Sequence, residues 1–289
     1  MADVVVITGA AGGIGAALAR RFADDGAAVA LLDRDADGVE RVASALRTVG
    51  HVALGLGCDI TDRGAVDAAF ARIHATLGPV TALINNAGLS QRSLFADTDP
   101  AVLRTVMEVN FFGAVHCTQA ALPDLKATRG VVAAVSSVAG FAPLVGRTGY
   151  AASKHALHGL FDSLRAELVR DGVAVLLVCP AYVATGIDQR ALDAHSARLG
   201  DAQKATIGRL ATPEAVADAI ARAVHARRRQ VVLTPVGKLA WWLTRFAPAL
   251  YEPLMRRSTR ADHPALAPHL VDAPRALWAQ VRGRRRAAF

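Results

Sequence analysis

A tyrosine and a lysine four residues apart, Tyr150 and Lys154, are the pair in this sequence best suited to chemistry. In a helix, residues four apart lie on the same face, so the phenol and the ammonium would point to one side. A nearby ammonium favours the phenolate, and a phenol with a lowered pKa can accept or release a proton near neutral pH. The alternative is a helix surface that carries both groups without a function.

A serine upstream could complete this pair. Ser137 lies thirteen residues before Tyr150, at the end of the apolar run GVVAAVSS. Ligands of open parallel sheets bind at the carboxyl ends of the strands, where the serine and the tyrosine-bearing helix would both point. A hydroxyl, a phenol and an ammonium could therefore converge on one carbonyl group.

The segment TGAAGGIG, residues 8–15, joins the first predicted strand to the first predicted helix. Its glycines at positions 9, 13 and 15 let the backbone turn tightly and approach a pyrophosphate. The free N–H groups of the helix N-terminus then bind the phosphates. A glycine-rich turn without a ligand is the alternative, but the strand–turn–helix context favours dinucleotide binding.

The second predicted strand ends in LLDRD, which places Asp33 eighteen residues after Gly15. A carboxylate at this position accepts hydrogen bonds from the adenosine ribose and repels a 2′-phosphate, which favours NAD over NADP. Arg34 argues the other way, since its guanidinium could hold that phosphate. We prefer a solvated loop charge for Arg34, and NADP stays the second choice of cofactor.

Short β-branched runs alternate with longer helical patterns along most of the chain. This alternation predicts an α/β fold with a doubly wound parallel sheet of about seven strands, a Rossmann fold. The predicted strands are 3–8, 28–33, 51–59, 80–88, 130–137, 173–180 and 230–235. The predicted helices are 13–26, 36–49, 62–77, 100–122, 149–170 and one that begins near 213. The polar, irregular segment 187–212 has the length of a mobile lid.

The chain of 289 residues divides into a catalytic domain, 1–234, and a basic, proline-rich helical extension, 235–289. The formal net charge is +8, and the extension alone holds ten Lys and Arg against three acidic residues. The body is therefore near neutral, which argues against a nucleic-acid partner.

The three cysteines, Cys58, Cys117 and Cys179, are far apart and have no metal-ligand spacing. We expect reduced thiols in a cytoplasmic protein and no metal site. The first strand begins by Val4, which leaves no room for a signal peptide. No long uncharged apolar run predicts a membrane-spanning helix.

The extension begins with an amphipathic pattern, GKLAWWLTRFAPAL, that Pro248 interrupts. One side of the predicted helix carries Leu239, Trp242, Leu243, Phe246 and Leu250, and Lys238, Trp241 and Arg245 fall elsewhere. Such a helix could lie in a membrane surface, which would place the protein peripherally at the inner face of the membrane. It could equally pack over the substrate cleft or against another subunit, and buried packing is the more common fate of such stripes. The terminal RGRRRAAF is expected to be a solvated end.

Together these motifs resemble the short-chain dehydrogenase/reductase family from about Asp3 to Pro235. Their order and spacing carry the resemblance, since each motif alone is weak. The motifs are TGAAGGIG, the CD of 58–59, NNAG at 85–88, Asn110 in MEVNFFG, Ser137 in VSSVAG, YAASK at 150–154 and PAYVAT at 180–185. The stretch YAASKHALHGLFDSLRAEL looks most like the branch with 11β-hydroxysteroid dehydrogenase-like and related membrane-associated reductases.

The resemblance implies a role for each catalytic residue. Tyr150 would be the general acid or base, and Lys154 would bind the nicotinamide ribose and lower the phenol pKa. Ser137 would hold the substrate oxygen, and Asn110 would anchor a water in a proton relay. The implied dinucleotide contacts are Gly9, Gly13, Ile14, Gly15, Asp33, Arg34, Asp59, Ile60, Asn86, Ala87, Gly88, Tyr150, Lys154, Pro180, Val183 and Thr185.

The resemblance also implies an NAD(P)-dependent oxidoreductase for a small-molecule secondary alcohol or ketone, and a homodimer or homotetramer. An apolar, steroid-like or lipid-like substrate would fit the branch, with segments 89–95, 141–147 and 187–211 shaping its pocket. One departure is Ala181, where the family usually has glycine, and this could alter the nicotinamide pocket. The competing class is a non-catalytic dinucleotide-binding or membrane-associated scaffold, which would have no need of the phenol.

Overall fold

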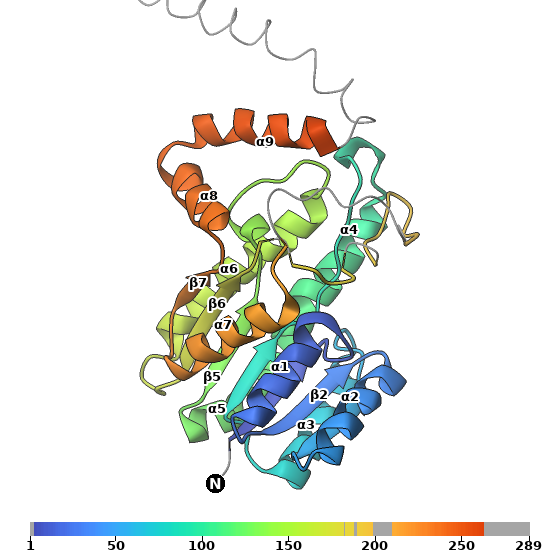
Figure 1. Cartoon of the computed structure of the whole chain (residues 1–289), viewed down its shortest axis with the longest axis vertical. Helices are drawn as coiled ribbons and strands as arrows, with labels where there is room; N and C mark the ends of the chain where they lie inside the picture. The colour runs from blue at the N-terminus through green and yellow to red at the C-terminus, as the bar shows by residue number, and fades with distance from the viewer. Residues whose placement is uncertain (1–2, 182, 188–189, 199–209, 263–289) are drawn as a thin grey trace, which may run out of the picture.

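A seven-stranded parallel sheet forms the centre of the protein (Figure 1). The structure, a computed structural model, describes residues 3–181, 183–187, 190–198 and 210–262, with side chains described as far as 255. The strand order is β3-β2-β1-β4-β5-β6-β7, which confirms the predicted doubly wound sheet. The strands are β1 Val4–Thr8, β2 Ala28–Asp33, β3 Ala53–Gly57, β4 Ala82–Asn85, β5 Val131–Val135, β6 Ala174–Cys179 and β7 Gln230–Val232.

The central strands are buried on both faces, which is why they read as continuous apolar runs. Every residue of β1 and β5 is buried. β1 pairs on one side with β2, Val5 facing Val29, and on the other side with β4, Val5 facing Ala82. β1 therefore lies where the strand order changes direction, the place at which ligands bind in such sheets.

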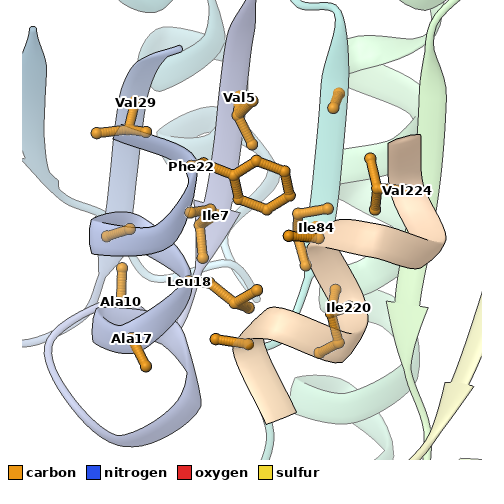
Figure 2. Packing of buried hydrophobic residues seen from close by; sticks show 14 of the residues in the cluster. Val5, Ile7, Ala10, Ala17, Leu18, Phe22, Val29, Ile84, Ile220 and Val224 are labelled. Atoms are coloured by element: carbon orange, nitrogen blue, oxygen red, sulfur yellow. The ribbon is translucent and has the colours of Figure 1, made fainter. Parts of the chain in front are cut away.

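Helices cover both faces of this sheet. They are α1 Gly13–Asp24, α2 Ala36–Thr48, α3 Arg63–Leu77, α4 Pro100–Met107, α5 Gly113–Thr128, α6 Thr148–Glu167 and α7 Pro213–His225. On one face α1 and α7 pack side by side, and Figure 2 shows Leu18 and Phe22 of α1 facing Ile220 and Val224 of α7. The other apolar cluster gathers side chains from α3, α5 and α6.

The helix predicted over 100–122 is wrong in two respects. A π turn, Glu108–Phe112, separates α4 from α5, and α5 continues past Pro123 to Thr128. The sequence offers no strong breaker at 108–112, because a π turn arises from packing and is common at functional sites. The helix ends instead at Arg129, which has φ 52 in the left-handed region and is followed by a glycine.

The extension forms two helices, α8 Pro235–Phe246 and α9 Pro248–Asp262. Thr234 caps α8 by accepting a hydrogen bond from Gly237 N, and Pro248 starts the second helix. Figure 1 shows both helices at one end of the molecule, beyond β7. None of the helices in the described residues has the length and apolar character needed to span a membrane.

Candidate active site

A cavity of about 660 Å³ lies along the carboxyl ends of the strands. Each of the first six strands contributes at least one residue at or just after its end. In strand order these residues are Gly9, Asp33, Asp59, Asn86, Ser137 and Pro180. The position agrees with the crevice in which open α/β sheets bind their ligands.

The cavity brings together most of the residues singled out from the sequence. Its lining includes Gly9, Gly13, Ile14, Asp33, Arg34, Asp59, Ile60, Asn86, Ala87, Gly88, Ser137, Tyr150, Lys154, Pro180, Val183 and Thr185. Gly15 and Asn110 are the two that do not line it. Both lie behind the cavity wall, where Gly15 packs against Gly9 and Asn110 forms hydrogen bonds with Leu89.

Two glycines shape the loop between β1 and α1. Gly9 has φ 68, and a Cβ there would lie 2.8 Å from the Cα of Ala87. A Cβ on Gly15 would lie 2.1 Å from the carbonyl oxygen of Gly9. Gly15 therefore lets the first turn of α1 pack against the loop, while Gly9 lets the loop pass close to β4. Such a cradle fits a pyrophosphate.

The NNAG motif fastens this loop to the end of β4. The Asn86 side-chain amide donates to the carbonyl oxygens of Thr8, at 2.9 Å, and Gly9, at 3.2 Å. In return, Thr8 Oγ1 accepts hydrogen bonds from the backbone N–H groups of Asn86 and Ala87, both at 3.0 Å. Part of the NNAG motif thus has a structural role, because its hydrogen bonds hold the β1–α1 loop in place.

Two carboxylates line the cavity at the carboxyl ends of β2 and β3. Asp33 accepts hydrogen bonds from the backbone N–H groups of Ala11 and Asp35, each at 3.0 Å, so its carboxylate is held beside the glycine loop. Burial raises the pKa of Asp59, but hydrogen bonds from the Thr61 N–H and hydroxyl, with a smaller contribution from Arg34, bring the pKa below its ordinary value. Both acids are acceptors placed for ribose or adenine groups, which fits a dinucleotide.

Tyr150 and Lys154 lie on α6 and point toward the same cavity. Their side chains are buried, with 8% and 3% of each residue exposed. Lys154 Nζ donates to the carbonyl oxygen of Val135 at 2.9 Å and lies 5.7 Å from the centre of the Tyr150 ring. Burial lowers the pKa of Lys154 to about 8, so the amine remains mostly protonated at neutral pH.

Asn110 lies in the π turn and is 1% exposed. Its amide donates to Leu89 O and Ser153 Oγ, both at 2.9 Å, and accepts from Leu89 N at 2.7 Å. A Cβ built on Gly88 would lie 3.4 Å from Asn110 Oδ1 and 3.5 Å from Lys154 Nζ. The amide oxygen and the amine therefore border one small space beside Gly88.

Ser137 caps a 3-10 turn, Val138–Gly140, through a hydrogen bond from Ala139 N to its hydroxyl at 3.1 Å. Next to it, Val138 N donates to Pro180 O at 3.0 Å, which ties the end of β5 to the end of β6. Ala181 is the departure from the family pattern. Its φ is not positive, so the backbone at this position does not require glycine.

Residues of the segments that the sequence predicts to contact the substrate also line the cavity. Leu89, Arg92, Leu144, Val145 and Arg147 lie in the predicted segments 89–95 and 141–147. The predicted lid, 187–212, lies partly outside the described residues, but Ile187, Arg190, Arg198 and Leu210 line the cavity.

Thr105 and Val109 also line the cavity, although the sequence pattern did not single them out. The local pattern of a helix does not reveal which of its residues face a cavity.

The extension supplies another wall of the cavity. The residues that do so are Val236, Gly237, Leu239, Ala240, Leu243, Tyr251, Leu254 and Met255. Tyr251 Oη also donates to Pro143 O at 3.3 Å, which connects α9 to the loop before α6. The predicted stripe is divided, because Leu239 and Leu243 line the cavity, whereas Trp242 and Phe246 are exposed. Packing over the cleft is thus the alternative that the structure favours for part of the stripe.

The fold and the cavity define a dinucleotide-binding protein of the open α/β type. A family model for the short chain dehydrogenases matches residues 3–196. The chain belongs to the short-chain dehydrogenase/reductase family. It is accordingly an NAD(P)-dependent oxidoreductase acting on CH–OH groups, and a non-catalytic scaffold is not favoured.

Similar curated proteins come from animals and bacteria. The chain is 38% identical over 268 residues to dehydrogenase/reductase SDR family member 7B of Bos taurus, covering 90% of this chain and 82% of that protein. It is 36% identical over 223 residues to 2-(S)-hydroxypropyl-CoM dehydrogenase 3 of Xanthobacter autotrophicus, covering 75% of this chain and 88% of that one.

Two solved structures resemble the whole catalytic fold. A short chain dehydrogenase/reductase from Burkholderia phymatum in complex with NAD has a TM-score of 0.75 and 26% identity, covering 84% of this chain and 92% of that one. An alcohol dehydrogenase from the archaeon Thermococcus sibiricus complexed with 5-hydroxy-NADP has a TM-score of 0.72 and 25% identity, covering 81% of this chain and 96% of that one. These likenesses support NAD(P) as the cofactor.

Proposed function

We propose that the protein interconverts a ketone and a secondary alcohol, with Tyr150 as the general acid and base. The observation that carries this proposal is the buried Lys154 ammonium, 5.7 Å from the Tyr150 ring in a cavity at the carboxyl ends of the strands. When bound, NAD(P) supplies or accepts the hydride, and the protein orients the reactants and moves the proton. The name of the Xanthobacter relative, a hydroxypropyl dehydrogenase, supports this class of reaction.

The proton is held at Tyr150 Oη. A free phenol has a pKa near 10 and is a poor base at neutral pH. Lowering that pKa by about three units requires about 4 kcal/mol of differential stabilisation. A buried ammonium close to the ring can supply much of this, because charge interactions are strong where water is excluded.

Ser137 and Asn110 complete the proposed proton path. Ser137, just after β5, donates to the substrate oxygen in the cavity that Tyr150 also lines. Both N–H groups of the Asn110 side-chain amide already have acceptors. Asn110 can therefore bind a water only by accepting a hydrogen bond at one of its oxygens. The space beside Gly88, bordered by Asn110 Oδ1 and Lys154 Nζ, is where we place that water.

Asp33 supports NAD as the preferred cofactor. Its carboxylate is fixed beside the glycine loop by Ala11 N and Asp35 N, so it cannot move away from a 2′-phosphate without losing these bonds. Arg34 is exposed and lines the cavity, and it is the group that would hold NADP if this assignment fails.

The main experiment combines binding and turnover. NADH and NADPH are titrated by nicotinamide fluorescence, and ketones and secondary alcohols are then assayed with the preferred cofactor. Tyr150→Phe should abolish turnover but bind the dinucleotide about as tightly as the wild type, because the phenol hydroxyl acts on the reacting oxygen. Turnover by this variant would exclude Tyr150 as the acid and base, and a strong preference for NADPH would overturn the assignment of Asp33.

We further propose an apolar, lipid-like or steroid-like substrate. Leu239, Leu243, Leu254 and Met255 contribute apolar side chains to the wall of the cavity. Leu239 and Leu254 are also 59% and 53% exposed, so this wall reaches the protein surface. Among the ketones of the panel, kcat/KM should rise with apolar surface, by about tenfold for every two methylene groups that become buried.

The exposed side of α8 and α9 is proposed to contact a membrane surface, at the inner face of the membrane of a cytoplasmic enzyme. Trp242 and Phe246 on α8 are 59% and 69% exposed, and Leu250 on α9 is 62% exposed. Lys238 and Arg245 are also exposed on α8. Exposed aromatic side chains next to basic groups suit an anionic interface. Three buried free cysteines support a reducing compartment.

Binding to anionic vesicles should fall with salt and with Trp242→Ser/Phe246→Ser. If vesicle binding is absent at low salt and the same double variant changes a homodimer or homotetramer to a smaller species, this surface is instead a subunit contact.

A further inference from the structure

His158 lies behind the catalytic pair and has no role in the chemistry described so far. On α6, Tyr150, Lys154 and His158 follow one another at intervals of four residues and so share one face of the helix. His158 does not line the cavity, and its imidazole contacts the carboxyl ends of β5 and β6 instead. His158 Nε2 is 3.1 Å from Ser136 Oγ, and Cys179 Sγ is 3.7 Å from the same nitrogen.

Ser136 connects this histidine to the lysine. Ser136 Oγ donates to the carbonyl oxygen of Lys154 at 3.3 Å. Since the hydroxyl proton goes to that carbonyl, the serine oxygen is the acceptor for His158, which assigns the Nε2–H tautomer to the imidazole. A chain of two hydrogen bonds therefore runs from His158 to the backbone of Lys154.

The tautomer assignment requires a neutral imidazole. Burial lowers the pKa of His158 to about 4. Of the charged groups nearby, His155, Arg245 and Lys154 lower this pKa further, and Asp162 raises it.

The thiol next to the imidazole is neutral as well. Burial raises the pKa of Cys179 to about 11, and Gln230 Nε2 lies 3.7 Å from its sulfur. The hydrogen bonds around His158 thus keep one pattern across the pH range in which the enzyme would work.

The fold leaves room for this pair at one glycine. A Cβ on Gly140 would lie 2.5 Å from Ser136 Oγ and 2.7 Å from His158 Nε2. Neither side chain can move away easily. Ser136 is 3% exposed, and the Phe141 ring packs edge-on against the His158 imidazole, with 6.1 Å between the ring centroids. Gly140 therefore permits a close contact that any larger residue would separate.

We propose that His158, through Ser136, is a positioning residue that sets the place of Lys154 relative to the Tyr150 phenol. Lys154 is held to the end of β5 at two points, by Nζ on Val135 O and by its own carbonyl on Ser136 Oγ. Without the His158 donor, the Ser136 hydroxyl is no longer held toward the Lys154 carbonyl, and this second point weakens. This turn of α6 can then shift from the sheet, and the ammonium moves with it. The inference rests on the proposed function for Tyr150 and Lys154.

The test uses three variants of the full chain. His158→Leu removes the donor, His158→Gln keeps a donor of similar reach, and Gly140→Ala separates the pair from the other side. His155→Gln is the matched control, since His155 is exposed on the same helix and its Nδ1 lies 2.9 Å from Ala151 O, within its own helix. Thermal melts followed by circular dichroism identify the variants that fold.

One readout is independent of turnover. The phenol of Tyr150 is titrated by ultraviolet absorbance in the apoprotein, with Tyr150→Phe subtracted to remove the other two tyrosines. In His158→Leu and Gly140→Ala the midpoint should move to higher pH by roughly half a unit, because the ammonium is less well placed. His158→Gln and His155→Gln should keep the wild-type midpoint.

The second readout is the pH profile of kcat on a ketone that the wild type reduces. His158→Leu should lower kcat about tenfold, and His158→Gln should recover most of it. A folded His158→Leu protein with the wild-type phenol midpoint would overturn the positioning role. If the wild type reduces no ketone, the proposed function fails, while the phenol titration still decides the role of His158.

Discussion

Replacing Lys154 by methionine should make the apoprotein more stable at neutral pH, although it should destroy the active site. Lys154 is 3% exposed, and burial lowers its pKa from 10.5 to about 8. That difference means that keeping the amine charged in the folded state costs about 3 kcal/mol of folding free energy. Methionine has a similar shape and no charge, but it loses the hydrogen bond to Val135 O, at a cost of about 1 kcal/mol. The net gain is about 2 kcal/mol.

The pH dependence has a definite sign. The folded pKa of Lys154 lies below the unfolded value, so between pH 8 and 10.5 the unfolded state binds more protons. The free energy of unfolding of the wild type therefore rises with pH in this window, relative to the variant. Below pH 8 the full penalty applies, and above 10.5 it is gone.

Urea unfolding without nucleotide, followed by circular dichroism at pH 7 and 9.5, measures this difference. Groups that titrate equally in both proteins cancel in the comparison. Lys126→Met is the control, because Lys126 is 44% exposed and pairs with Asp171 at 2.9 Å, an interaction worth less than about 1 kcal/mol. The reasoning is refuted if Lys154→Met is no more stable than the wild type at pH 7, or if its advantage is the same at both pH values.

Two further predictions concern glycines. Gly15→Ala should lower the free energy of unfolding by about 3 kcal/mol and abolish NADH binding in the fluorescence titration, since its Cβ would meet Gly9 O at 2.1 Å. Gly12→Ala, with φ −176 and no protein atom within 4 Å of a Cβ, should keep the wild-type free energy of unfolding, and an equal loss of stability in both variants would contradict the packing argument. Gly113→Ala should cost about 1–3 kcal/mol in urea unfolding, because its Cβ would lie 2.5 Å from Ile60 Cδ1. In an Ile60→Ala background the same change should be nearly neutral, and a cost that persists there would rule out this contact as the cause.

The sheet and most of the cavity could be predicted because their signals are local. Buried parallel strands are continuous apolar runs, and residues at their ends share one edge of the sheet. Asp33, Ser137 and Asn86 therefore line one cavity although they are far apart in the chain. The boundaries were less accurate, and strands expected at 51–59 and 80–88 are Ala53–Gly57 and Ala82–Asn85.

Tertiary contacts account for what the sequence could not reveal. Asn110 was singled out by its motif, but its partners, Leu89 and Ser153, are known only once the π turn meets α6. The wall formed by α8 and α9 depends on contacts such as Tyr251 with Pro143, 108 residues earlier in the chain. An apolar stripe indicates that a helix packs, and the fold alone determines against what.

The pairing of α1 with α7 has a consequence for how the protein is made. Leu18 and Phe22 belong to α1, yet the helix that covers them, Pro213–His225, is synthesised much later. Until that late segment is synthesised, the nascent chain must expose these side chains, which favours chaperone binding over early independent folding. The segment matched by the family model, 3–196, would for the same reason be a poor autonomous unit.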